Sequence, residues 1–222
     1  LSHDVVAWLI RSGTIINKKA IDRAQKLKII GRAGVGVDNI DIECATKRGI
    51  VVTNTPDVNT TSACEHTIAL MLTLSRNISL GDQSIKIGNW NRNELIGTEL
   101  RSKTIGIIGM GKIGRELMKR CLSFDMKILA YDPYVNKDLI ESENVVLVSL
   151  DKLFSNSDFI STHVPLNDNT RDLINKESFS LMKSNVRIIN VARGGIINEQ
   201  DLADALKKNK IAGAAIDVFS KE

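Results

Sequence analysis

Residue types that mark several classes of protein are scarce in this chain. Its 222 residues include 3 cysteines and 3 prolines, and aromatic residues make up 4%. The odd number and wide spacing of Cys44, Cys64 and Cys121 argue against a disulfide framework, so we expect reduced core residues. Because few rings are available to stack on bases, we expect no nucleic-acid partner.

Long apolar runs and runs of one charge are also missing. No segment approaches the length of a membrane span, and the first residues lack the basic region and cleavage site of a signal peptide. We therefore expect a cytoplasmic protein with no membrane partner. The net charge of +4 comes from 30 basic and 26 acidic residues scattered along the chain. The length suits one large domain, or one domain plus part of another.

The most informative stretch that is present runs from Thr104 to Arg115, TIGIIGMGKIGR. An apolar run ends at Gly109 and helical spacing follows Gly111, which predicts a strand, a glycine turn and a helix. Gly109 would permit the tight turn, Gly111 would let the backbone approach a pyrophosphate, and Gly114 would let helix and strand pack closely. The pyrophosphate would lie at the helix N-terminus.

A second apolar run, residues 127–131, ends at Asp132. A carboxylate there would accept hydrogen bonds from ribose hydroxyls and repel a 2′-phosphate, which favours NAD over NADP. The alternative is that Asp132 and Pro133 only form a turn that ends the strand. The complete order of strand, glycine turn, helix, strand and acid favours the dinucleotide site.

Strands alternate with helices along the chain, which predicts an α/β fold built from parallel βαβ units. The turn-rich segment 54–62 is the best candidate for a domain boundary. We expect a partial, flavodoxin-like substrate-binding domain over residues 1–55 and a Rossmann-type doubly wound parallel sheet over residues 56–222. Ser62 and Glu65 have capping-box spacing for a long helix, and residues 81–100, which have weak periodicity, are expected to form an arm.

Ligands bind beyond the carboxyl ends of strands in such sheets, and several strand ends carry candidate residues. Arg193 precedes two glycines, although a surface cation is the commoner role of a single arginine. Asp217 lies in an apolar run, where a carboxylate needs a partner or a ligand. Val164 and Pro165 end a strand where a cofactor ring could lie, whereas Glu222 alone indicates nothing.

A second glycine turn, residues 32–36, could cradle another anion, with Arg11 and Arg32 as cations for a doubly charged substrate. On this segment alone, a tight connection with solvated arginines is the better interpretation. Hydride transfer would also need a proton donor such as histidine. His3, His66 and His163 occupy no obvious catalytic position, and His66 and His163 suit structural roles. No metal site is expected.

The chain resembles the D-isomer-specific 2-hydroxyacid dehydrogenases in a series of motifs that occur in the family's order: GRAGVGVDNID at 31–41, NTP at 54–56, GTEL at 97–100, GIIGMGKIGRE at 106–116, YDP at 131–133, HVPL at 163–166, NVARGGIIN at 190–198 and GAAIDVF at 213–219. The likeness is greatest to members that act on a phosphorylated 2-hydroxy acid. It covers essentially the whole chain.

The resemblance implies an NAD-dependent oxidoreductase that transfers hydride between the substrate's C2 and nicotinamide. It implies catalytic roles for Arg193, which pairs with the substrate carboxylate and carbonyl oxygen, and for Glu222, which orients a catalytic histidine and raises its pKa. It implies a small phosphorylated 2-hydroxy or 2-keto acid as partner, and a homodimer or homotetramer formed through the long helix and the arm. The implied cofactor-binding residues are Gly109, Gly111, Lys112, Ile113, Gly114, Asp132, Val164, Val191, Ala192, Asp217 and Val35, and the implied substrate-binding residues are Arg11, Arg32 and Asn59.

Two departures from the family pattern shape the expectation. The family's histidine follows the glutamate in a Pro-His segment, and the family's chain starts with an earlier strand. We therefore expect an incomplete version of a longer protein that binds NAD but turns over poorly. Two alternatives stay open: a reductase of glyoxylate, hydroxypyruvate or another 2-ketoacid, and a non-catalytic, NAD-sensing module like the related transcriptional corepressors.

Overall fold

The computed structural model describes residues 4–136 and 142–221. By its internal contacts the chain divides into two compact units, Leu1–Thr60 and Thr61–Glu222. Both units are of the α/β class with parallel strands, which confirms the expected fold class. None of the helices in the described part of the chain is long and apolar enough to cross a membrane.

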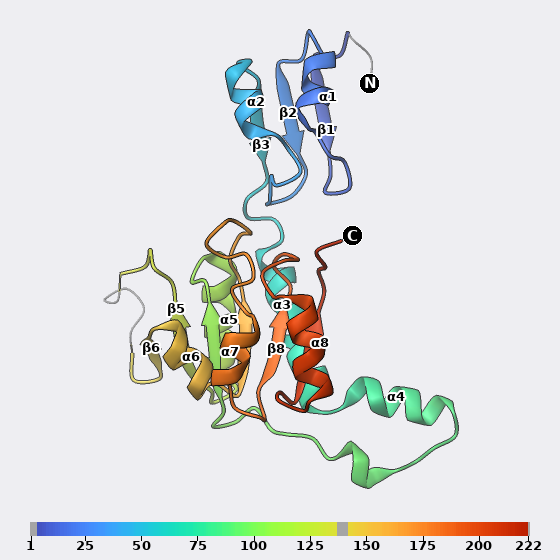
Figure 1. The fold of residues 1–222 in the computed structure, drawn as a ribbon, viewed down its shortest axis with the longest axis vertical. Coiled ribbons are helices and arrows are strands. Elements are labelled where there is room, and N and C mark those ends of the chain that lie inside the picture. Colours follow the sequence, from blue (N-terminus) through green and yellow to red (C-terminus); the bar gives the residue numbers. More distant parts are fainter. Residues whose placement is uncertain (1–3, 137–141, 222) are drawn as a thin grey trace. The chain divides into compact units, whose positions relative to one another are not determined.

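The first unit is a three-stranded parallel sheet in the order β1-β2-β3, with one helix after each of the first two strands (Figure 1). Its elements are β1 (Ala7–Ile10), α1 (Lys18–Arg23), β2 (Ile29–Arg32), α2 (Ile42–Lys47) and β3 (Val51–Asn54). Burial alternates along the strands, because successive side chains point to opposite faces. Trp8 and Ile10 are buried with the helices, whereas Leu9 is 92% exposed.

The second unit holds a six-stranded parallel sheet in the order β6-β5-β4-β7-β8-β9. The chain starts at the centre with β4, moves outward to one edge, and then returns to build the other half. This is the strand order of the Rossmann fold, in which the order reverses between the two central strands. The strands are β4 (Thr104–Ile108), β5 (Lys127–Tyr131), β6 (Val145–Leu147), β7 (Phe159–Thr162), β8 (Arg187–Asn190) and β9 (Gly213–Ile216).

Helices cover both faces of this sheet (Figure 1). One core joins Ile105 and Ile107 to the helices α3 (Thr60–Ser75) and α5 (Lys112–Ser123). The opposite core joins Ile108 and Ile160 to α6 (Leu150–Asn156), α7 (Lys176–Leu181) and α8 (Glu199–Lys207). The central strands β4, β7 and β8 are almost completely buried because helices cover both faces, which explains why they are mostly apolar.

One local expectation is wrong. The helix α3 begins at Thr60, so Ser62 lies inside it and cannot form the expected capping box with Glu65. The expected arm includes the helix α4 (Ile78–Lys86) and a 3₁₀ turn (Arg92–Leu95), which were not predicted. Asn77, at φ 52°, takes the left-handed conformation that asparagine tolerates and separates α4 from α3. None of the residues of α4 is buried, and its apolar residues Ile78, Leu80 and Ile85 are about half exposed.

Candidate functional site

The glycine turn joins β4 to α5 at the carboxyl edge of the large sheet. Gly109 has φ +97°, and a Cβ there would lie 2.6 Å from the carbonyl oxygen of His163. A Cβ on Gly114 would overlap the carbonyl oxygen of Gly109, so the helix could not approach the turn. A Cβ on Gly111 would meet nothing within 4 Å. Gly111 therefore faces open space at the N-terminus of α5, where backbone N–H groups attract an anion.

The peptide groups of Met110 are fixed from two sides. The Met110 N–H donates to Asp132 Oδ2 at 2.8 Å, and Arg115 Nε donates to the Met110 carbonyl oxygen at 2.9 Å. The other carboxylate oxygen, Asp132 Oδ1, accepts from the N–H of Tyr134 at 2.9 Å. Asp132 thus ends its strand with a turn and also ties that strand to the glycine turn. Its role toward a ribose stays a prediction.

A cavity of about 450 Å³ opens beside this turn. Gly109 and Gly111 line one side, Asp132 and Tyr134 line another, and residues 163–173 close it. A cavity that joins a helix N-terminus to a strand-end carboxylate is the kind of place at which doubly wound sheets bind nucleotides.

His163 lies at the wall of this cavity, just after β7. Its Nε2 is 2.9 Å from the hydroxyl oxygen of Ser161, which is completely buried. Burial lowers the pKa of His163 to about 4, because the charged imidazolium is poorly solvated there. The ring is therefore neutral at pH 7, as expected of a satisfied packing histidine and unlike a general acid.

Asn190 organises the far strand ends, although nothing in the sequence had singled it out. Its side chain is buried: Oδ1 accepts from the Thr162 hydroxyl and the Ala192 N–H, and Nδ2 donates to the Arg193 carbonyl oxygen at 2.9 Å. Its own carbonyl oxygen accepts from the Asp217 N–H at 3.0 Å. One residue thus joins the ends of β7, β8 and β9. A polar residue closing an apolar strand was the available signal.

The loop that carries Arg193 packs directly on the segment after β9. A Cβ on Gly194 would overlap the carbonyl group of Phe219, so the two backbones are in contact. The Ser220 N–H donates to Glu199 Oε1 at 2.6 Å, which ties the same segment to the start of α8. Arg193 Nη1 donates to the Ala192 carbonyl oxygen. Glu222, the expected partner of a catalytic histidine, lies outside the described residues.

Asp217 follows β9 instead of lying within it, and its side chain is 51% exposed. It has a partner: Asp217 Oδ1 is 3.3 Å from Nε2 of His66, which α3 carries. Four other expected cofactor residues of this unit lie at the start of α5 or just after β7 and β8. Lys112 opens α5, and Ile113, Val164 and Val191 are half-buried against the two cores.

The expected substrate residues lie in the first unit. Strand pairing sets Ile10 beside Arg32, so Arg11 and Arg32 both lie at the carboxyl edge of the small sheet. Arg32 Nε is buried and has no hydrogen-bond partner among the described residues. Val35 is held by Asn54 Nδ2, which donates to its carbonyl oxygen at 2.7 Å. Asn59 lies in the turn before α3.

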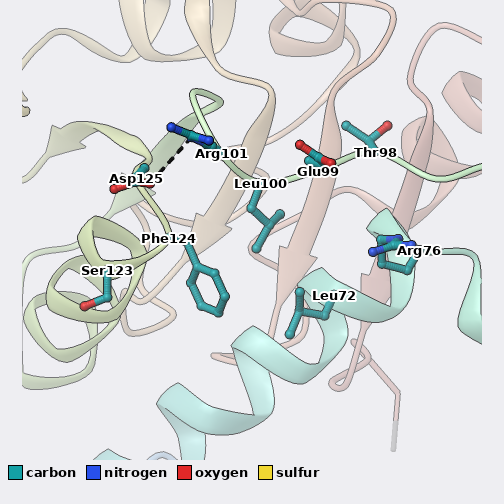
Figure 2. Close-up of a pocket in the computed structure, with 9 residues that line it drawn as sticks. All are labelled: Leu72, Arg76, Thr98, Glu99, Leu100, Arg101, Ser123, Phe124 and Asp125. Carbon is teal, nitrogen blue, oxygen red and sulfur yellow. Dashed lines mark ion pairs between the residues drawn. The ribbon is translucent and has the colours of Figure 1, made fainter.

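Figure 2 shows another hollow of the second unit, between the end of α3, the segment Thr98–Arg101 and the end of α5. Its ion pair, Arg101 Nε to Asp125 Oδ2 at 3.7 Å, is largely exposed and stabilises the fold little. The hollow lies where β4 and β5 begin, at the amino ends of the strands. Ligands of doubly wound sheets bind at the carboxyl ends, so this hollow is separate from the cavity beside Gly111.

Comparison with known proteins identifies the class. The model of the family described as D-isomer specific 2-hydroxyacid dehydrogenase, NAD binding domain, matches residues 68–222. The chain belongs to this family, and the expected cofactor, NAD, is confirmed by the same match.

Individual relatives show which members of the family the chain is similar to. The chain is 49% identical to D-3-phosphoglycerate dehydrogenase of Methanocaldococcus jannaschii over 220 residues, and 51% identical to that of Archaeoglobus fulgidus over 216. These matches cover 99% and 97% of the chain but 42% and 41% of the relatives, so the chain spans about two fifths of their length. D-lactate dehydrogenase from Aquifex aeolicus, solved with NAD and lactic acid, superposes with a TM-score of 0.92 at 34% identity, covering 99% of this chain and 66% of that one.

Proposed function

We propose that this chain forms the cofactor-binding part of an enzyme that oxidises 3-phospho-D-glycerate to 3-phosphohydroxypyruvate with NAD, the first step of L-serine biosynthesis. The observation that carries the proposal is the carboxyl edge of the large sheet, where an open glycine turn, the strand-end carboxylate of Asp132 and the Asn190-fixed Arg193 loop occur together. The names of the curated relatives support this substrate over lactate or glyoxylate.

Each group would have a separate task. Gly111, Lys112 and Ile113 would hold the pyrophosphate at the start of α5, and Asp132 would accept from a ribose. Bound NAD supplies the hydride acceptor. Arg193 would pair with the substrate's carboxylate and its C2 oxygen, so that negative charge developing on that oxygen is stabilised. Asp217 would accept a hydrogen bond from the carboxamide of nicotinamide.

The cofactor site can be tested by a substitution that the fold tolerates. Gly111→Ala places a methyl group in open space, so thermal stability should stay unchanged while the Kd for NADH rises at least about tenfold, because the pyrophosphate loses close backbone contacts. Gly13→Ala is the matched control, since its Cβ also meets nothing within 4 Å. Equal NADH affinity in both variants, measured by fluorescence titration, would refute the site.

The phosphorylated substrate is assigned to Arg11 and Arg32. The buried, unpartnered Arg32 Nε supports an anion at this edge of the small sheet, because such a donor is costly to leave unpaired. In an enzyme that contains this chain, Arg11→Ala should raise KM for 3-phosphohydroxypyruvate far more than for glyoxylate or pyruvate. An equal effect on all three would favour a reductase of unphosphorylated 2-ketoacids.

We also propose a cytoplasmic homodimer or homotetramer that uses the arm around α4. The arm projects from the second unit (Figure 1) and leaves Ile87 at 75%, Trp90 at 63% and Ile96 at 76% exposure. Exposed apolar groups gathered on one segment are typical of an interface. Trp90→Glu with Ile87→Lys should convert the oligomer to a monomer in sedimentation velocity. A species of unchanged mass would contradict the arm's role.

A further inference from the structure

The helix α3 runs beside β9 in the opposite direction. A Cβ at Gly213, where β9 begins, would lie 3.5 Å from Cδ2 of Leu74 near the end of the helix. Just beyond the other end of the strand, Asp217 meets His66. The eight-residue step from His66 to Leu74 spans roughly 12 Å of helix, and the four-residue step from Gly213 to Asp217 spans roughly 13 Å of strand. Packing along the whole helix therefore sets His66 beside Asp217.

The pair between His66 and Asp217 contributes little to folding. The two side chains are 46% and 51% exposed, and exposed pairs of this kind stabilise proteins weakly. The backbone of Asp217 is already fixed, because its N–H donates to the Asn190 carbonyl oxygen. What remains free to rotate is the carboxylate, and exposed side chains change rotamer within nanoseconds. Contact with His66 selects one orientation.

That orientation suits an amide ligand. His66 Nε2 can donate to Asp217 Oδ1 both as the neutral Nε2–H tautomer and as imidazolium. Oδ1 is then engaged, and within the described chain no second side chain pairs with Asp217, so Oδ2 can accept from an NH₂ group. We propose that His66 is a positioning residue, which holds the Asp217 carboxylate ready for the carboxamide of nicotinamide. The inference rests on the proposed function, which assigns Asp217 to that carboxamide.

The test compares NADH with ADP-ribose, which carries the adenosine and pyrophosphate but no nicotinamide. In titrations of the 222-residue chain, His66→Leu should raise the Kd for NADH about three- to tenfold and leave the Kd for ADP-ribose unchanged, as expected when a contact that orients a carboxylate is lost. His66→Gln should restore most of the affinity, because its amide N–H₂ can replace Nε2. Glu65→Gln, an exposed neighbour on α3, is the matched control and should change neither ligand.

Two further measurements sharpen the result. The reduced 3-acetylpyridine analogue of NADH lacks the amide donor, so His66→Leu should leave its Kd unchanged. In the unsubstituted chain, the imidazole NMR signals of His66 should shift on adding NADH but not on adding ADP-ribose. Equal losses for NADH and ADP-ribose, or no rescue by glutamine, would overturn the positioning role. Failure of the unsubstituted chain to bind ADP-ribose would overturn the proposed cofactor site, and this inference with it.

Discussion

The side-chain amide of Asn190 donates a hydrogen bond to the carbonyl oxygen of Arg193 at 2.9 Å. The bond links a buried strand to a loop whose conformation would otherwise depend on two following glycines. Because Oδ1 of Asn190 also accepts from Thr162 and Ala192, the amide cannot turn without breaking all three bonds. The direction of the Arg193 loop is therefore set by a buried side chain three residues before it.

Asn190→Ala should destabilise the protein by about 2–4 kcal/mol, because a buried hydroxyl and a carbonyl oxygen lose their partners. Urea unfolding followed by circular dichroism measures the change. Asn190→Asp is a second variant for comparison. It keeps the oxygen that accepts from Thr162 but places a carboxylate oxygen against the Arg193 carbonyl oxygen. If alanine costs less than about 0.5 kcal/mol, the side chain does not organise these strand ends.

Gly114→Ala should damage the fold, whereas Gly111→Ala should damage only NADH binding. The Cβ that the first substitution adds would overlap a backbone oxygen, and no change of rotamer can relieve that conflict. We expect Gly114→Ala to lose about 3 kcal/mol or more of unfolding free energy, near the upper end for overpacking. Thermal melting of both variants without ligand checks this. Similar melting temperatures would show that the turn can relax.

The stability should depend on His163 between about pH 6.5 and pH 4. The folded pKa of about 4 is below the ordinary value of 6.5, so on acidification the unfolded chain takes up a proton before the folded chain does. Stability therefore falls as pH drops through this window, by about 3 kcal/mol in full, since each pKa unit is worth about 1.4 kcal/mol. His163→Gln should flatten this part of the profile in urea titrations.

Asp158 provides an internal comparison for that profile. Burial alone would raise the pKa of its carboxyl group, but hydrogen bonds from the Thr104 N–H, Lys183 and Asn185 outweigh burial and lower it. Its stabilising contribution is present above its ordinary pKa of 3.8 and is lost as pH falls below that value. The His163→Gln variant should keep this more acidic loss. If His163→Gln leaves the slope of stability against pH unchanged between pH 6.5 and pH 4, a group other than His163 causes the dependence.

Asp132→Asn should reduce the preference for NADH over NADPH and lower stability. An amide NH₂ would face the N–H of Met110 or of Tyr134, so one hydrogen bond is replaced by a clash of donors, at a cost of about 1–2 kcal/mol. Removing the charge also removes its repulsion of a 2′-phosphate. Paired titrations give the ratio of the Kd for NADPH to the Kd for NADH, and this ratio should fall at least about threefold. A ratio equal to that of the unsubstituted chain would exclude Asp132 as the discriminating group.

The elements that a single pattern defines could be predicted from the sequence. The glycine turn, the alternation of strands and helices and the strand-end acid depend on local chemistry, and the structure places Gly109, Gly111 and Asp132 around one cavity. The glycine turn and Asp132 predicted the cofactor, NAD, before the family resemblance implied it again, and the family match confirms it. The roles of the individual site residues stay predictions.

Features that depend on contacts between distant segments could not be predicted. His66 resembles any exposed helical histidine until β9 is seen beside α3, and Asn190 resembles any polar strand end until Thr162 and Arg193 are seen around it. The helix α4 was not predicted from the sequence, and in the structure it buries none of its residues.

The central position of β4 has a consequence for assembly. Gly109 belongs to the first half of the sheet, but the backbone that it contacts, at His163, follows β7 in the second half. The cavity therefore does not exist until β7 has paired with β4, whichever half folds first. A nucleotide that binds there can stabilise only the completed sheet, by mass action on the native state. NADH should accordingly slow proteolysis of the whole second unit, and would serve as a chemical reporter that both halves have joined.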